Sequence, residues 1–461
     1  MSADKAPTVT QARSPVLHRS ISKEYPIAVR GEGAWLIDDL GKRYLDFASS
    51  AVVNFIGHGD AEIARAMAEQ ASQLEFAHSS SFTTGVAEQF ARELLEFAGP
   101  EYRSGAVFFT SGGSEAVESA LKLARQYQVE IGGKERYQIV SRRQSYHGST
   151  FGAMAVSGNE SRRGMYLPML REFPKAEIPN CYRCAYNCEN GCADCGEKYA
   201  AGVRRAIAET NGTAAAFIME PISGATLGAV APSPAYVHRV AEICRQEGVL
   251  LIADEVMTGF GRTGRNFAMQ HWDATPDIIA VGKGISSGYA PLGAIIVKKH
   301  IVDAIAKGTG ALLHGFTYNA HPVAVAAGRV VLQRIVERKL VQAADSDCEG
   351  TIGGHLKREL QKLWRLPCVG DIRGLGLLWA IEFVADKAAK EPYPAERKFA
   401  AKVNDACMKR GLMLYPMQGC ADGKRGDHVM IAPPAIIVKD EIAWAVDCLG
   451  ESIEEAQKEM P

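Results

Sequence analysis

Gly248-Val-Leu-Leu-Ile-Ala-Asp254 is the stretch that decides the fold class, and Pro276-Asp-Ile-Ile-Ala-Val-Gly-Lys283 repeats its pattern further along the chain. Both runs are apolar, partly β-branched and bounded by glycine or proline, which predicts short buried strands of a parallel sheet. Ligands of open α/β sheets bind at the carboxyl ends of such strands. A lysine and an aspartate there suit pyridoxal phosphate, because Lys283 can form a Schiff base while Asp254 keeps the pyridinium nitrogen protonated. A buried Asp–Lys ion pair is the other interpretation.

The composition describes a globular α/β chain long enough for two or three domains. The 461 residues are 47% hydrophobic and 23% charged, with 45 glycines. A formal net charge of −1 argues against nucleic acid or an anionic membrane as a partner. No apolar stretch approaches the ~20 residues that span a bilayer.

The N-terminal segment has no apolar core of a secretory signal. Residues 5–23 carry four basic and no acidic side chains, a faint likeness to a mitochondrial presequence. Pro7 and Pro15 favour an extended arm over an amphipathic helix. A cytoplasmic location is therefore the expectation.

Five of the eleven cysteines lie in one segment with the order C-x2-C-x3-C-x3-C-x2-C. They are Cys181, Cys184, Cys188, Cys192 and Cys195. The two CxxC pairs are closer together than in the usual zinc ribbon or finger. A bound metal and a disulfide stay open, but free thiols in a surface loop are favoured, and we assign no metal ligands.

Apolar runs alternate with helical patterns through the middle of the chain. The expected strands are 106–109, 137–140, 215–219, 248–253, 276–282 and 293–297. Such alternation predicts βαβ units and a mainly parallel central sheet.

The two chain ends are expected to build a smaller α+β domain. A hairpin is predicted over 27–48, and helices over 60–75, 86–98, 322–344, 395–410 and from 439 onward. We assign 1–75 to an N-terminal arm and part of the small domain, 76–330 to the large domain and 331–461 to the C-terminal small domain.

The stretch Thr110-Ser-Gly-Gly-Ser-Glu-Ala116 follows a predicted strand and opens a helix. Small residues let a phosphate approach the backbone, and the helix N-terminus offers free N–H groups, so Gly113 and Ser114 are candidate phosphate contacts. A simple N-capping turn explains the same residues.

Two further motifs follow predicted strands. The ring of Tyr146, in Tyr146-His147-Gly148, could stack on the pyridine face, although a turn with a packed ring is the common alternative. Glu220, before Pro221, could orient the region of the cofactor's phenolic oxygen or pair with a cation in the site. A carboxylate at a helix entry is its plainer interpretation.

Asp254-Glu-Val-Met-Thr-Gly-Phe-Gly-Arg-Thr-Gly264, read with Val281-Gly-Lys-Gly284 and Ser111-Gly-Gly-Ser-Glu-Ala116, resembles the class III aminotransferases. These are pyridoxal-phosphate enzymes of fold type I, and the resemblance runs from about Trp35 to Ile437, with the branch that transfers ω-amino groups most similar.

The resemblance implies a role for each matched residue. Lys283 would carry the cofactor and shuttle a proton, and Asp254 would hold the ring nitrogen protonated. Val256 would pack on the ring face opposite Tyr146. Thr317, in His314-Gly-Phe-Thr-Tyr-Asn319, would reach the phosphate of a neighbouring subunit. The enzyme would then be a homodimer or a dimer-based tetramer.

Two departures from the family bear on the substrate. Met257 stands where the ornithine and GABA branch has glutamine, and Met430 stands where that branch places a carboxylate-binding arginine. A thioether cannot replace a guanidinium fork.

A replacement for that arginine is Arg425, because the Gly-Asp-His that follows it resembles the triplet after a mobile arginine in amine–pyruvate transaminases. A solvated loop cation is the alternative. Phe82 and Tyr318 are candidate pocket residues, with core packing as the alternative.

The predicted activity is transfer of an amino group from an ω-amino acid or amine, such as β-alanine, taurine or a primary amine, to a keto acid such as pyruvate by a ping-pong mechanism. An aminomutase, a racemase or a decarboxylating transaminase would use the same Lys283 and Asp254. A metal- or redox-sensing protein built on the segment Cys181–Cys195 is a third hypothesis.

Overall fold

The computed structural model describes residues 15–21, 23–186 and 193–460. A seven-stranded sheet lies at its centre, in the order β4-β10-β9-β8-β7-β5-β6. Its strands are β4 (Ala106–Thr110), β5 (Gln138–Arg142), β6 (Lys175–Ala176), β7 (Ala214–Met219), β8 (Leu250–Asp254), β9 (Ile278–Val281) and β10 (Gly293–Val297). All neighbours from β9 to β6 are parallel, whereas β10 is antiparallel to both β4 and β9. The predicted mainly parallel sheet is confirmed. The antiparallel direction of β10 was not predicted, because an apolar run has the same pattern in either direction.

Both faces of this sheet are covered by helices, which explains the uninterrupted apolar runs. In β7, Ala216 and Ile218 share a core with helix α4 (Gly113–Glu130). The alternate residues Phe217 and Met219 share a second core with the paired helices α7 (Ala193–Ala208) and α8 (Pro234–Glu247). Because side chains alternate along a strand, every residue of β7 is buried.

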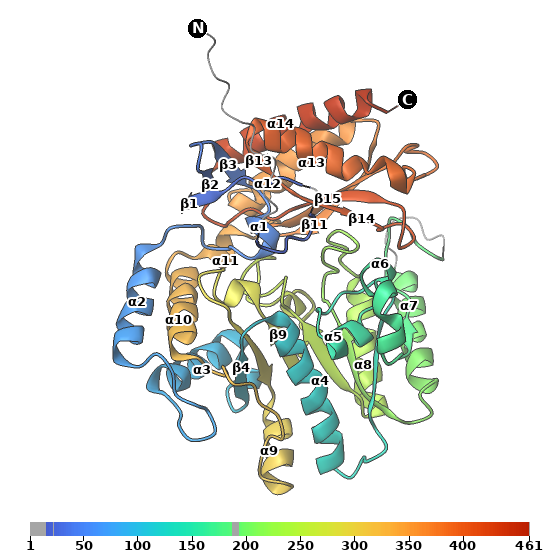
Figure 1. The fold of residues 1–461 in the computed structure, drawn as a ribbon. Coiled ribbons are helices and arrows are strands. Elements are labelled where there is room, and N and C mark those ends of the chain that lie inside the picture. The colour runs from blue at the N-terminus through green and yellow to red at the C-terminus, as the bar shows by residue number, and fades with distance from the viewer. Residues whose placement is uncertain (1–14, 22, 187–192, 461) are drawn as a thin grey trace.

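A four-stranded sheet joins the two ends of the chain, in the order β1-β2-β3-β13. Strands β1 (Ala28–Glu32), β2 (Trp35–Asp38) and β3 (Arg43–Asp46) form a meander, and β13 (Leu412–Met413) adds to β3 in parallel. In Figure 1 the blue strands β1, β2 and β3 lie beside the red C-terminal helices. The small domain therefore draws on both chain ends, as predicted.

A second four-stranded sheet is wholly antiparallel, in the order β11-β12-β15-β14. It comprises β11 (Val369–Leu375), β12 (Leu378–Phe383), β14 (Tyr415–Gln418) and β15 (Asp427–Ile431). Helices α12 (Ile352–Gln361) and α13 (Phe399–Arg410) both pack against the closing helix α14 (Lys439–Lys458).

The remaining helices flank these sheets. They are α1 (Ser49–Val52), α2 (Ala61–Gln73), α3 (Gly85–Ala98), α5 (Phe151–Val156), α6 (Glu160–Arg163), α9 (Lys299–Lys307), α10 (Pro322–Glu337) and α11 (Leu340–Ala343), with 3-10 turns at 100–102, 164–169, 268–272, 283–285, 362–365 and 395–397. The predicted helix over 322–344 is thus two helices, because Lys339 adopts a left-handed conformation between them.

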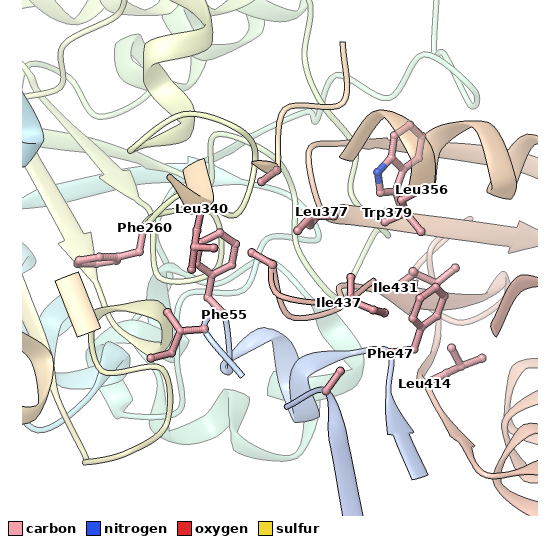
Figure 2. Close-up of a cluster of buried hydrophobic side chains, with 14 of the residues drawn as sticks. Phe47, Phe55, Phe260, Leu340, Leu356, Leu377, Trp379, Leu414, Ile431 and Ile437 are labelled. Atoms are coloured by element: carbon pink, nitrogen blue, oxygen red, sulfur yellow. The ribbon is translucent and has the colours of Figure 1, made fainter. Parts of the chain in front are cut away.

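One hydrophobic cluster connects the small sheets to the large one (Figure 2). It brings Phe47 and Ile431 together with Phe260 and Leu340, which belong to distant parts of the sequence. This shared core fixes how the chain ends sit over the large sheet, while the boundaries at 75 and 330 stay predictions. None of the helices in the described residues is long and apolar enough to cross a membrane.

Candidate active site

Asp254 and Lys283 lie at the ends of neighbouring strands. Strand β8 ends at Asp254, which pairs in register with Ala280 of β9, and Lys283 follows the end of β9. Lys283 has a left-handed backbone, with φ of 44°, a conformation that costs a non-glycine residue roughly 1–2 kcal/mol. Strain of this kind is held in place by surrounding structure and clusters at functional sites.

The lysine amine lies in a partly buried environment that favours its neutral form. Burial lowers the pKa of Lys283, Asp254 and Glu220 oppose this, and the positive charge of Arg162 adds to the lowering. The neutral amine is the nucleophile, so a lowered pKa increases the reactive fraction near neutral pH.

Asp254 is buried and is held from two sides. Its Oδ2 lies 2.7 Å from Nδ1 of His147, and its Oδ1 accepts a hydrogen bond from the Val256 N–H at 3.1 Å. No ion pair joins Asp254 to Lys283 within the residues that the structure describes. The carboxylate is therefore oriented by a histidine, and the simple buried Asp–Lys pair is not what this site contains.

His147 is a site residue that was not predicted from the sequence. Its backbone N–H donates to Ser157 Oγ, and its Nε2 is buried without a hydrogen-bond partner among the described residues. Its position next to Tyr146, at the same edge of the sheet, was the available signal. A sequence cannot show that the ring turns toward Asp254.

The candidate phosphate loop lies at the N-terminus of α4, next to Val256. A Cβ atom on Gly113 would lie 2.7 Å from Val256 Cγ1, so any larger residue would force the loop or the valine to shift. Ser114 Oγ accepts a hydrogen bond from the Ser149 N–H at 3.0 Å, and Gly112, the N-cap residue, provides no side-chain cap. The first N–H groups of this 18-residue helix thus suit an anion.

Glu220 supports the loop that carries Tyr146. Its Oε2 accepts from the Tyr146 N–H at 3.3 Å and its Oε1 from the Gly224 N–H at 3.0 Å. Burial raises the pKa of Glu220, and the nearby charge of Asp254 adds to this. The next helix, α8, begins only at Pro234, so the helix-entry interpretation is wrong.

Two arginines near Tyr146 were not predicted. The buried Arg142 donates to the carbonyl oxygen of Glu220, which ties the end of β5 to the end of β7. The guanidinium of Arg162 lies over the Tyr146 ring, 4.4 Å from its centroid.

These residues fit pyridoxal phosphate. Lys283 supplies an amine, Asp254 a carboxylate fixed by His147, and the glycine-lined helix N-terminus a place for phosphate. Val256, in contact distance of Gly113, and Tyr146 offer an apolar and an aromatic surface for a ring.

The family model for "Aminotransferase class-III" matches residues 19–453. The chain belongs to the class III aminotransferases. This family depends on pyridoxal phosphate, and the fold-type I architecture predicted from the sequence is confirmed by solved transaminase structures.

Three similar proteins place this aminotransferase within the family. The uncharacterized aminotransferase YodT of Bacillus subtilis (strain 168) is 37% identical, over 97% of this chain and 99% of YodT. A thermostable (S)-enantioselective omega-transaminase from Thermomicrobium roseum is 34% identical with a TM-score of 0.85, over 94% of this chain and 93% of its own. A PLP-bound amine transaminase from an uncultivated Pseudomonas species is 31% identical with a TM-score of 0.87, over 99% of each chain.

Three predicted residues of the aminotransferase lie on exposed segments. Thr317 lines a cavity of about 880 Å³ together with His78 and Phe108, and neither Lys283 nor Asp254 lines it. The side chains of Phe82 and Tyr318 are 70% and 60% exposed, so neither is a core aromatic. Their roles in cofactor and substrate binding stay predictions, which in the case of Thr317 involve a neighbouring subunit.

Arg425 lies in the loop between β14 and β15 and is held by two carboxylates. Its Nε donates to Asp422 Oδ2 and its Nη1 to Glu391 Oε1, each at 2.8 Å. These bonds raise the pKa of its guanidinium, with Asp422 as the main cause. In this conformation the Arg425 guanidinium is bound at the surface by Asp422 and Glu391. Its role as a mobile acid-binding group stays a prediction.

The cysteine segment lies only partly within the described residues, since Cys188 and Cys192 fall outside them. Cys195 is disulfide-bonded, so the favoured interpretation of free thiols is wrong for this residue. Cys184 Sγ lies 3.5 Å from Cys195 Sγ. The described residues contain no group of three side chains that could hold a metal ion.

Proposed function

We propose that this aminotransferase moves an amino group from an ω-amino acid or primary amine to a keto acid, with pyruvate as the acceptor, by a ping-pong mechanism. The observation that carries the proposal is that Lys283 and Asp254, which His147 orients, lie at the ends of adjacent strands. Pyridoxal phosphate, when bound, supplies the electron sink that proton abstraction next to nitrogen requires.

Each residue at this edge then has a defined task. Lys283 Nζ binds the cofactor and afterwards moves the proton at the substrate carbon. Asp254 holds a proton on the ring nitrogen, and His147 orients Asp254. Gly113 and Ser114 bind the phosphate, while Tyr146 and Val256 enclose the ring and Glu220 fixes the Tyr146 loop.

Two methionines, Met430 and Met257, support this choice of donor. Met430 stands where other branches of the family have the arginine that binds the substrate α-carboxylate. Met430 lies within β15 and is fully buried, so its position offers no guanidinium. Met257 packs against Gly224, whose Cβ, if present, would lie 2.8 Å from its sulfur. Neither thioether can hold a carboxylate as a guanidinium does, so both changes weaken the case for ornithine, acetylornithine and GABA as donors.

We further propose a homodimer, or a tetramer built from two such dimers, in the cytoplasm. Two segments line the cavity that contains Thr317, residues 78–83 and 312–320. They carry the large exposed side chains of Phe82, Leu313 and Tyr318. Large apolar side chains exposed on neighbouring segments are typical of an interface between subunits, and they support a contribution of Thr317 to a neighbouring site.

A visible absorption scan of the purified enzyme with pyridoxal phosphate tests the proposed activity. We expect a yellow band that bleaches when β-alanine, taurine or a simple primary amine is added and returns with pyruvate. A band that none of these donors bleaches would contradict the proposal. That result would favour an aminomutase, a racemase or a decarboxylating transaminase that uses the same Lys283.

A further inference from the structure

A second cavity lies beside Tyr146, with a volume of about 450 Å³. Its wall includes Arg19, Tyr146, Ser149, Ser157, Arg162 and Tyr166. Two of these residues connect it to the candidate active site: the Tyr146 N–H binds Glu220, and the Ser149 N–H binds Ser114. The cavity is thus a neighbour of the proposed cofactor site and has positive charge on its wall.

Arg162 is the main charge of this cavity. It belongs to the short helix α6, which Asn159 caps through its side chain. Its guanidinium stacks on the Tyr146 ring at 4.4 Å, and its Nη2 lies 3.7 Å from Met417 Sδ on β14. Arg162 therefore spans the junction between the large sheet and the β14–β15 hairpin.

In the described part of the chain, Arg162 has no acidic partner, in contrast to the neighbouring Arg163. Within the described residues, no carboxylate lies at ion-pair distance from Arg162 or from Arg19. Arg163, by contrast, pairs with Glu160 and Glu172. A partly buried guanidinium usually finds an acidic partner, because leaving its donors unmatched costs free energy. A stacked guanidinium also keeps its planar fork available for a bidentate partner.

We propose that Arg162 binds the carboxylate of the ω-amino acid donor or the keto acid acceptor, with Arg19 completing the positive wall of the cavity. This rests on the proposed function, since it names the residue that recognises the acid group of its substrates. Tyr146 presents Arg162 next to the cofactor site, and the charge of Arg162 already reaches Lys283, whose pKa it lowers. Primary amines without an acid group would not use this contact.

Calorimetric titration of the holoenzyme with 3-hydroxypropionate, a carboxylate that lacks an amine, tests the contact without turnover. We expect Arg162→Met to weaken this binding about 10- to 100-fold, the range for hydrogen bonds to charged groups. Arg162→Lys keeps the positive charge and loses the planar guanidinium. Its affinity for 3-hydroxypropionate should lie between those of the wild type and Arg162→Met. Arg171→Met is the matched control, because it removes a guanidinium that stacks on Tyr137 at 4.6 Å and does not line this cavity.

Steady-state kinetics then separates acid recognition from a general loss of structure. Arg162→Met should raise KM for β-alanine and pyruvate about tenfold or more beyond any change in the half-reaction with a simple primary amine. Unchanged carboxylate binding in Arg162→Met, or an equal loss with the primary amine, would overturn the proposal. An acid-specific loss in Arg425→Met with none in Arg162→Met would also overturn it.

The proposed function fails separately. If the wild-type holoenzyme transfers no amino group from any donor to pyruvate, the proposed activity is wrong. Calorimetry with 3-hydroxypropionate would still show whether Arg162 binds a carboxylate.

Discussion

The carboxyl edge of the large sheet and the β14–β15 hairpin both present charged side chains, but they hold them in different ways. Asp254 has a side chain that is 6% exposed, and its two oxygens are oriented by His147 and the Val256 N–H. Arg425 has a side chain that is 46% exposed and is held by Asp422 and Glu391. The sheet edge fixes its charges through strand register and burial, whereas the hairpin loop relies on surface ion pairs, each worth at most ~1 kcal/mol.

The strongest test of the sheet edge is Lys283→Ala. We expect turnover to fall by at least about 10,000-fold, because the variant lacks the amine that binds the cofactor and moves the proton. Pyridoxal phosphate should still bind, without the yellow band. Turnover and the absorption spectrum are measured, with Lys298→Ala as the control. Lys298 is also a partly buried lysine with a lowered pKa, but it donates to Thr275. Turnover within tenfold of the wild type would remove Lys283 from its role.

Asp254→Asn tests whether the carboxylate works together with His147. We expect turnover to fall about 100- to 1,000-fold, because an amide cannot hold the ring nitrogen protonated. His147→Ala should lower turnover less than Asp254→Asn does. If His147 acts only by orienting Asp254, the turnover of the double variant should equal that of Asp254→Asn alone. Additive losses in single-turnover kinetics would show that His147 has an independent role.

The buried part of the β14–β15 hairpin contains His428, whose contribution to stability can be tested by changing the pH. Burial lowers the pKa of His428 to about 4, and its Nε2 lies 2.9 Å from the Ala225 carbonyl oxygen. The unfolded chain, whose histidine pKa is near 6.5, binds the extra proton first as pH falls. The contribution of neutral His428 is thus fully present above pH 6.5 and is lost toward pH 4, by up to about 3 kcal/mol.

Chemical denaturation of wild type and His428→Gln at several pH values between 4 and 7 measures this dependence. The variant should show a flatter change in the free energy of unfolding across that range. Parallel curves for the two proteins would assign the acid sensitivity to other groups.

Gly113→Ala gives the smallest expected effect. The added Cβ would lie 2.7 Å from Val256 Cγ1, so the phosphate loop must shift and the affinity for pyridoxal phosphate should fall about tenfold. The double variant Gly113→Ala/Val256→Ala removes the clashing methyl group and should recover part of the loss in a cofactor titration. If Gly113→Ala binds pyridoxal phosphate as tightly as the wild type, the contact with Val256 does not determine the conformation of the phosphate loop.

The sequence by itself determined the strands and the chemistry at their ends. Runs such as residues 250–253 are apolar at every position because both faces of the sheet are covered, so the pattern appears in the sequence without any knowledge of partners. Parallel strands bring their carboxyl ends to one edge, and Asp254 and Lys283 followed from that rule and from their motifs.

Only the tertiary structure decided which side chains meet. His147 reaches Asp254, and Arg162 reaches Tyr146 and Met417, across separations in the sequence that no local pattern connects. The reversal of β10, the β3–β13 pairing of the two chain ends and the surface partners of Arg425 also depend on packing. Periodicity reports whether a residue is buried, and the direction of a polar side chain is set by the neighbours that the fold brings to it.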